Sequence, residues 1–285
     1  MNRPGQLSIS PALGVVILLV FTFSLFALTG ELYAAGAAKE IRIGGTGSAL
    51  ATLKLLGEQF RKKHPDITIT VLPSLGSSGG IKALFGGDLD IAISYRELYE
   101  DEYQKGLAAI EYARTPFVFL THKTNKLSNI TLQEVADIYN GKTKIWPDDT
   151  PIRLILRPAG EASTKILERM SEDMNRAVAN SLKRNGLNIA INDQENADLI
   201  ERLPGSFGAG ALCQIISEKR DLNILSLNGV KPDVRTLADG AYPYFKVLYI
   251  ITAPKSSPQV RQFIAFVFSP SGRSILGKTG HMVTR

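Results

Sequence analysis

The chain has 285 residues, a formal net charge of +6 at pH 7 and a single cysteine. This length is ample for two domains with a sizeable core, and one cysteine excludes an internal disulfide. The three histidines are scattered and have no metal-ligand spacing, no H-E-x-x-H or G-x-S-x-G motif occurs, and no aromatic-interleaved basic run suggests nucleic acid. We therefore expect neither a catalytic residue nor a metal or other cofactor, while the positive charge favours anionic partners.

The first 38 residues have the layout of a secretory signal peptide. Arg3 supplies a positive start, residues 13–28 are mostly apolar, and residues 34–38 are alanine-rich. The apolar run is shorter than the about 20 residues of a membrane-spanning helix, which favours cleavage over an uncleaved anchor. Cleavage is expected after Ala35, Ala37 or Ala38. No cysteine lies nearby, so a lipid anchor is excluded, and we expect a periplasmic or otherwise exported protein.

After residue 38 the strand and helix patterns alternate, which predicts α/β layers with largely parallel sheets. Strands are expected at 41–44, 67–72, 91–94, 109–120, 152–156, 223–225 and 245–251. Helices are expected at 49–63, 79–84, 132–139, 164–179, 194–203, 212–219 and 259–268, with a last short one from residue 271.

Two long strand-like runs, at 109–120 and 242–252, each contain a proline and are predicted to cross between two lobes. Lobe one then comprises residues 39–116 and 246–285, and lobe two is the insertion 117–245. The interface between two such lobes is a usual place for a small ligand.

The first of three strand-to-helix turns reads Gly44-Gly45-Thr46-Gly47-Ser48. It has no Gly-Lys-Ser/Thr to close a nucleotide P-loop, and it lacks the glycine spacing of the dinucleotide fingerprint. The turn is either an ordinary connection in which Ser48 caps the next helix, or an anion-binding turn.

The second turn, Leu75-Gly76-Ser77-Ser78-Gly79-Gly80, runs directly into an amphipathic segment. A helix N-terminus leaves backbone N–H groups unpaired and carries a partial positive charge. Glycines allow a ligand to approach that backbone, and the hydroxyls of Ser77 and Ser78 add donors. The pattern favours an oxyanion site, with a plain N-cap as the alternative.

The third turn follows the apolar strand at 152–156 and runs from Arg157 through Gly160 and Glu161 to Ser163. Arginine suits oxyanions because its planar guanidinium donates paired hydrogen bonds. The alternatives are a surface or lobe-bridging salt bridge for Arg157 and a simple capping role for Ser163.

Ordered motifs along residues 40–285 resemble the phosphate-binding proteins of bacterial phosphate ABC importers, in the type II periplasmic-binding-protein superfamily. The motifs are GSSGGIK at 76–82, LQEVADIYNGK at 132–142, IW at 145–146, PGSFG at 204–208, NGVKP at 228–232 and FSPSGR at 268–273. The resemblance implies a two-lobed monomer that captures inorganic phosphate or a related oxyanion for an ABC permease, without catalysis. The alternative is a non-transport envelope sensor or interaction module with weakened or altered anion binding.

The resemblance also implies a ligand site between the lobes. The residues that match it are Gly47, Ser48, Ser77, Arg157 and Ser163, with Ser78 in the same turn as Ser77.

Two positions depart from the family pattern. Tyr95 stands where the phosphate binders usually have an aspartate that accepts the proton of hydrogen phosphate, and Glu161 replaces a hydroxyl donor. Two like charges about 4 Å apart repel by about 4 kcal/mol at an effective dielectric constant near 20. Phosphate binding is therefore expected to be weaker and less selective, unless Glu161 turns to solvent or pairs with Arg96 or Lys165.

Overall fold

The computed structural model describes residues 39–284, so the predicted signal peptide lies outside the described residues. Within that range strands and helices alternate, as the sequence predicts. The strands are β1 (Lys39–Gly45), β2 (Ile67–Val71), β3 (Ile91–Ser94), β4 (Ala108–His122), β5 (Asn129–Ile130), β6 (Arg153–Leu156), β7 (Asn188–Ile189), β8 (Ser206–Ala211), β9 (Leu222–Leu227), β10 (Phe245–Thr252) and β11 (Met282–Val283).

A short 3-10 helix, η1, precedes the α-helices. The helices are η1 (Gly47–Ala49), α2 (Leu50–Arg61), α3 (Gly76–Phe85), α4 (Glu100–Gln104), α5 (Leu132–Asn140), α6 (Ala162–Arg169), α7 (Glu172–Leu182), α8 (Asp193–Arg202), α9 (Leu212–Ser217), α10 (Val234–Ala238), α11 (Pro258–Val267) and α12 (Pro270–Lys278). In the described part of the chain, no helix combines the length and the apolar character needed to cross a bilayer.

The strands form one open sheet in the order β2-β1-β3-β10-β4-β8-β6-β7. Toward the two ends of the sheet, β1 pairs with β3 and β6 pairs with β7 and β8 in parallel. In the middle, β10 is antiparallel to β3 and β4, and β4 is also antiparallel to β8. The expectation of largely parallel sheets is therefore wrong at the centre, because the chain leaves along β4 and returns along β10 in the opposite direction.

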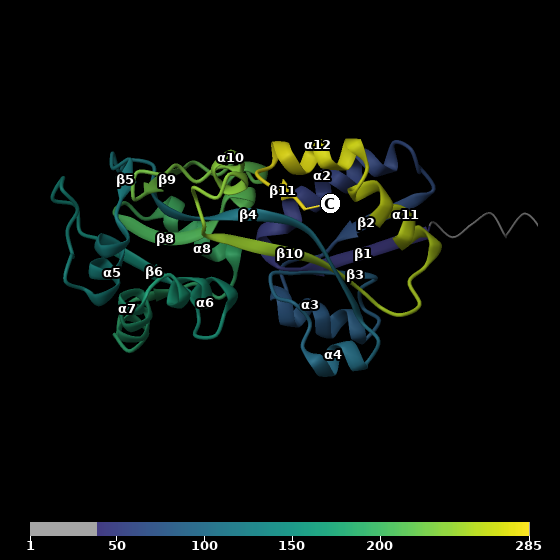
Figure 1. Cartoon of the computed structure of the whole chain (residues 1–285), viewed down its shortest axis with the longest axis horizontal. Coiled ribbons are helices and arrows are strands. Elements are labelled where there is room, and N and C mark those ends of the chain that lie inside the picture. The colour runs from purple at the N-terminus through teal and green to yellow at the C-terminus, as the bar shows by residue number, and fades with distance from the viewer. Residues whose placement is uncertain (1–38, 285) are drawn as a thin grey trace, which may run out of the picture. The chain divides into compact units, whose positions relative to one another are not determined.

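Strand β4 connects the two groups of elements seen in Figure 1. Its first half pairs with β10, up to Pro116 opposite Phe245, and its second half pairs with β8 from Phe117 onward. The return path is fixed beside this junction, where the Tyr242 hydroxyl donates to the carbonyl of Phe117 at 2.7 Å. Residues Glu40–Arg285 nevertheless form one compact unit, so the lobe boundaries at 116/117 and 245/246 stay a prediction.

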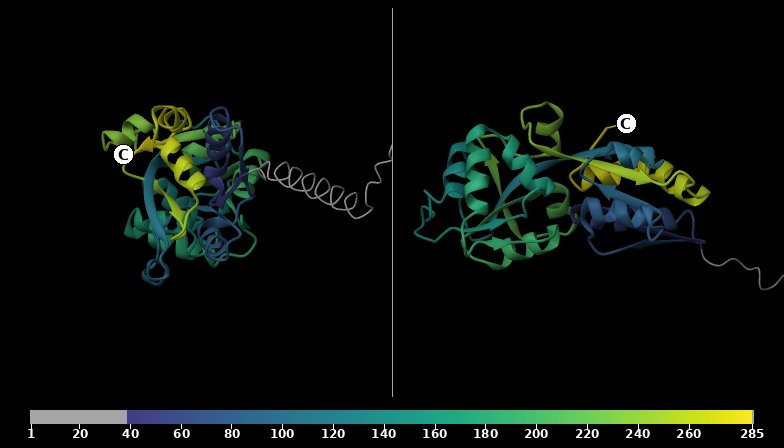
Figure 2. Two further views of the ribbon diagram at one scale, coloured as in Figure 1. Left: turned by 90° about the vertical axis from the view of Figure 1, so that its right-hand side faces the viewer. Right: turned by 90° about the horizontal axis from the view of Figure 1, so that it is seen from below.

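Each group of elements has a hydrophobic core of its own. In the first, α2 buries Leu53, Leu56 and Phe60 at helical spacing, and the ring of Phe60 meets two phenylalanine rings of α11. In the second, Phe119 on β4 stacks on Phe207 of β8 at a ring-centroid distance of 5.8 Å. The view from below in Figure 2 shows the two groups with the sheet strands running between them.

Two helix boundaries differ from expectation at positions that matter here. Helix α3 begins at Gly76 rather than at residue 79, so Ser77 and Ser78 belong to its first turn. The single helix expected at 164–179 is two helices. The first ends at Arg169, and Ser171 begins the next, since its hydroxyl caps α7 by accepting from the Met174 amide at 3.1 Å.

Candidate functional site

The first turn presents a backbone amide to an anionic group. Ser48, fully buried in η1, donates its N–H to the Asp193 carboxylate at 3.1 Å, and the Thr46 hydroxyl donates to the same oxygen at 3.2 Å. The anion that meets this turn is thus a side chain of the same molecule, 145 residues away from Ser48 along the sequence. Asp193 is the first residue of α8, where a negative charge is favoured by the helix dipole.

Arg157 lies directly after β6, and only 8% of it is exposed. One guanidinium nitrogen donates to the carbonyl of Ala190 at 2.8 Å, and another lies 3.9 Å from Asp193 Oδ1 and 3.5 Å from Glu161 Oε1. Within residues 39–284, the Nε of Arg157 has no hydrogen-bond partner although it is buried. Arg157 is therefore a buried cation between two carboxylates.

Glu161 is the N-cap of α6, and its Oε2 accepts the amide of Ser163 at 2.7 Å. This capping geometry turns the carboxylate back toward Arg157, four residues earlier, so Glu161 pairs with Arg157 rather than with Arg96 or Lys165. Arg96 instead forms a paired contact with Glu102, with both distances at 2.7 Å. Glu161 contacts the same guanidinium as Asp193.

The second turn contributes to the site less directly. The half-buried Ser77 accepts the backbone amide of Tyr95 at 2.9 Å, whereas the exposed Ser78 accepts from Arg96 Nε at 3.2 Å. The Tyr95 side chain is buried, and its hydroxyl lies 3.8 Å from the sulfur of Cys213. Burial, with Cys213 and Asp193 nearby, raises the pKa of Tyr95, so its phenol stays protonated and able to donate at neutral pH.

Lys246 is a second buried cation, which was not predicted from the sequence. Its side chain is fully buried near the start of β10, and Nζ lies 3.8 Å from Asp193 Oδ1 and 4.3 Å from the ring centroid of Tyr95. None of the described residues gives this ammonium group a hydrogen-bond partner. A lysine inside an otherwise apolar strand was the available signal, since lysine is almost never fully buried unless it is paired.

The charges around Asp193 keep it ionised. Burial alone would raise the pKa of this carboxyl, but Lys246, Arg157 and the hydrogen bond from the Ser48 amide lower it below its ordinary value. Two cations and two donors therefore converge on one buried carboxylate.

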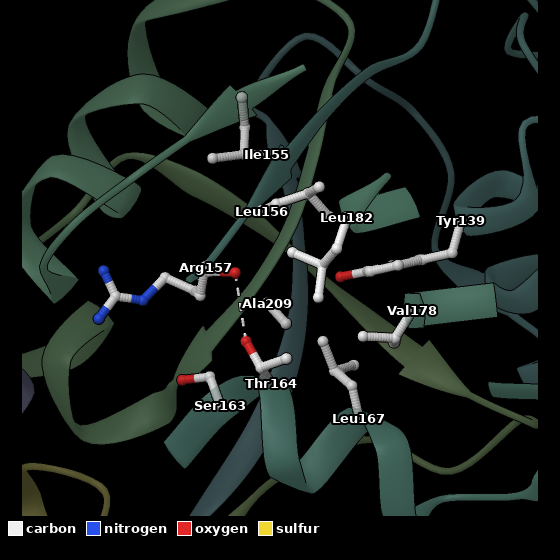
Figure 3. Close-up of a pocket in the computed structure, with 10 residues that line it drawn as sticks. All are labelled: Tyr139, Ile155, Leu156, Arg157, Ser163, Thr164, Leu167, Val178, Leu182 and Ala209. Atoms are coloured by element: carbon white, nitrogen blue, oxygen red, sulfur yellow. Dashed lines mark hydrogen bonds between the residues drawn. The ribbon is translucent and has the colours of Figure 1, made fainter. Parts of the chain in front are cut away.

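A small cavity adjoins Arg157 on one side. A cavity of about 10 Å³ lies beside Arg157, Ser163 and several apolar side chains, which is room for at most one water molecule. In Figure 3 the guanidinium of Arg157 points away from Leu167, Val178 and Leu182, on the same side as the Ser163 hydroxyl. The cavity is on the apolar side of Arg157, so it is not the place for an anion.

The structure thus links most of the predicted site residues. Asp193 contacts Ser48 and Arg157, and Lys246 links Asp193 to Tyr95. Glu161 joins them through Arg157, and Ser163 is buried beside Glu161. Gly47 adjoins the same carboxylate, because a Cβ on Gly47 would lie 3.1 Å from Asp193 Cβ. Ser77 reaches the cluster only through the backbone of Tyr95, and Ser78 lies outside it. No group of three or more His, Cys, Asp or Glu side chains within 39–284 is placed to hold a metal ion.

The sequence profile of the PBP superfamily domain matches residues 33–271. The chain belongs to this superfamily. A curated relative, the phosphate-binding protein PstS of Borreliella burgdorferi, is 29% identical over 258 residues, which cover 86% of this chain and 90% of the relative. PstS of Bacillus subtilis is 23% identical over 267 residues, covering 89% of this chain and 82% of that protein.

Solved structures agree on the fold. A candidate phosphate ABC transporter substrate-binding protein from Clostridium perfringens, with bound phosphate, superposes with a TM-score of 0.72 at 23% identity. The match covers 87% of this chain and all of that one. An ABC-type phosphate transport receptor from Vibrio cholerae gives a TM-score of 0.59 at 20% identity, over 86% of this chain and all of that one. The expected resemblance to the phosphate-binding proteins and the α/β fold with an open sheet are confirmed, and the relatives are named as binding proteins or transport receptors.

Proposed function

We propose that this chain is an exported solute-binding protein that captures a phosphate-like oxyanion between its two lobes and hands it to an ABC importer in the membrane. The observation that carries the proposal is the convergence of Arg157, Lys246 and the Ser48 amide on a single buried point. Charged and backbone donors of this kind suit an ionised, multi-oxygen ligand. The names of the relatives favour phosphate among such ligands.

The mechanism is capture rather than catalysis. The lobes separate about β4 and the return segment into β10, an oxyanion meets the turn amides, hydroxyls and Arg157, and closure of the lobes buries it. A membrane permease recognises the closed form, and the protein acts as a monomer. The predicted ligand residues are Gly47, Ser48, Ser77, Ser78, Tyr95, Arg157, Glu161 and Ser163.

A non-transport role is the second candidate, and the carboxylates beside Arg157 favour it. Glu161 lies 3.5 Å and Asp193 3.9 Å from the guanidinium, so part of its charge is neutralised before any ligand binds. A sensor or interaction module of the envelope would tolerate the weaker oxyanion binding that results.

A transport assay combined with binding measurements distinguishes the two candidate functions. Calorimetry with phosphate, sulfate and molybdate on the protein from residue 39 onward gives affinity and selectivity. Reconstitution with a phosphate ABC permease and its ATPase then tests whether the loaded protein stimulates ATP hydrolysis. Saturable phosphate binding together with stimulation supports transport, binding without stimulation supports the second candidate, and no oxyanion binding at all refutes both.

A further inference from the structure

Asp193 presents to the first turn the chemistry of an oxyanion. Its Oδ2 accepts the Ser48 amide at 3.1 Å and the Thr46 hydroxyl at 3.2 Å, and its Oδ1 lies 3.8 Å from Lys246 Nζ. An ionised carboxylate is an acceptor-only group with two oxygens, as is one edge of a phosphate or sulfate ion. Its hydrogen bonds and charge pairs are those that the proposed ligand would make.

The donors around Asp193 outnumber what its carboxylate accepts. Among the described residues, Ser48 Oγ, Arg157 Nε and Lys246 Nζ are buried and have no hydrogen-bond partner. Buried polar groups are nearly always satisfied, and three unpaired ones around one charge are unusual. A tetrahedral oxyanion has more oxygens than a carboxylate, so this donor set fits an external ligand better than it fits Asp193.

The contact also joins the two predicted lobes. Thr46, Ser48 and Lys246 belong to predicted lobe one, whereas Asp193 belongs to lobe two. Next to it, the side-chain amide of Gln194 donates to the Gly47 carbonyl at 2.9 Å. The start of α8 packs so closely on the turn that a Cβ on Gly47 would collide with Gln194.

We propose that the Asp193 carboxylate is an internal occupant of the oxyanion site, which holds the lobes together when no ligand is bound and must leave before an oxyanion can enter. This inference rests on the proposed function for the identity of the external ligand. The closed, unliganded form is then a competitor of the ligand, and it lowers the apparent affinity by the fraction of molecules that it occupies. Asp193 is a residue of this chain that sets how much oxyanion is needed for loading.

Three variants test the proposal. Asp193→Asn keeps the shape and removes the charge, and Asp193→Ala removes the whole carboxylate. Asp198→Asn is the matched control, because it makes the same change on the same helix at a carboxylate that pairs with Arg220. Phosphate affinity is measured by calorimetry, and the opening of the unliganded protein by its radius of gyration in small-angle scattering.

We expect Asp193→Asn to bind phosphate at least about tenfold more tightly than the unchanged protein, with Asp198→Asn unaltered. Unliganded Asp193→Ala should have a larger radius of gyration than the unchanged protein. Sodium formate should raise the melting temperature of Asp193→Ala, since formate replaces the missing carboxylate, and should leave that of Asp198→Asn unchanged. If Asp193→Ala does not fold, Asp193→Asn is used for the scattering comparison as well.

The failures of the two proposals are distinguishable. In one outcome no variant binds phosphate, but Asp193→Ala opens the unliganded protein and formate restores its stability. The proposed phosphate function is then wrong, while the role of Asp193 as the group that holds the lobes together is supported. Phosphate binding that is equal in the unchanged protein and Asp193→Asn, without opening, overturns the internal occupant alone. Weaker phosphate binding by Asp193→Asn also overturns it, because Asp193 would then be a ligand residue that accepts the proton of hydrogen phosphate.

Discussion

The buried charges of Lys246 and Asp193 should stabilise each other, and their energetic coupling can be measured. Lys246 is fully buried, its Nζ lies 3.8 Å from Asp193 Oδ1, and the described residues offer this nitrogen no hydrogen bond. At that separation two unit charges attract by about 4 kcal/mol at an effective dielectric constant near 20. Removal of one partner of a buried ion pair typically costs about 3–5 kcal/mol, because the other charge stays buried without compensation.

The perturbation is a double-mutant cycle of Lys246→Met, Asp193→Asn and the double variant. Each free energy of unfolding is obtained from urea denaturation. Because Asp193 retains Arg157 and the hydrogen bonds from Thr46 and Ser48, we expect a coupling of about 2–4 kcal/mol, below the full cost of a lone buried charge. The double variant should be more stable than the sum of the two single changes predicts.

The control is a surface pair of the same two residue types. Lys123 and Asp221 lie 2.5 Å apart, but their side chains are 55% and 65% exposed, so their coupling should be only about 0.2–1 kcal/mol. A Lys246–Asp193 coupling no larger than that of the control would mean that these two charges are hydrated rather than buried together.

Three further predictions concern ligand binding and pH. Arg157→Ala should weaken oxyanion binding by about 2–5 kcal/mol in calorimetry, and an unchanged affinity would remove this residue from the site. Tyr95→Asp combined with Glu161→Ser should shift preference toward phosphate over sulfate, whereas an unchanged ratio would show that neither position sets selectivity. Burial lowers the pKa of His281 from 6.5 to about 4, and hydrogen bonds to the backbone offset only part of this shift. As the pH falls, the unfolded chain therefore binds a proton at His281 before the folded protein does. Stability should therefore fall by about 3 kcal/mol as pH drops from 6.5 to 4, and a folded His281→Asn variant that keeps the whole slope would contradict this origin.

The turns at the site were predictable because residues adjacent in the sequence determine their local chemistry. Glycines next to hydroxyls, placed between an apolar strand and an amphipathic helix, led to the first and third turns. The buried strand β6 and the position of Arg157 at its end followed from the apolar run at 152–156. The direction in which Glu161 points did not follow, because a capping contact with the Ser163 amide decided it.

Strand β8 was missed for a physical reason. Its sequence, Ser-Phe-Gly-Ala-Gly-Ala, has no β-branched residue and therefore little strand propensity. Its small residues are required by neighbours from distant elements, since a Cβ on Gly208 would lie 2.7 Å from Ile200 and one on Gly210 would lie 3.0 Å from Leu120. Tertiary packing, which a single sequence does not display, determines that strand.

Asp193 and Lys246 were missed for a related reason. Asn192 and Asp193 have the pattern of a helix start, which they are, and nothing nearby indicates that Asp193 faces a turn 145 residues away. Lys246 lies within an apolar run that predicted only a buried strand. Both residues matter because of their contact with each other, and only the fold brings them together.

A crystal structure of the protein grown in saturating phosphate would show whether an oxyanion binds where Ser48, Arg157 and Lys246 converge. We expect one tetrahedral anion bonded to the Ser48 amide and to Arg157, with the Asp193 carboxylate moved away from Ser48. A structure in which Asp193 still accepts from Ser48 and phosphate is bound elsewhere, or not at all, would contradict this expectation.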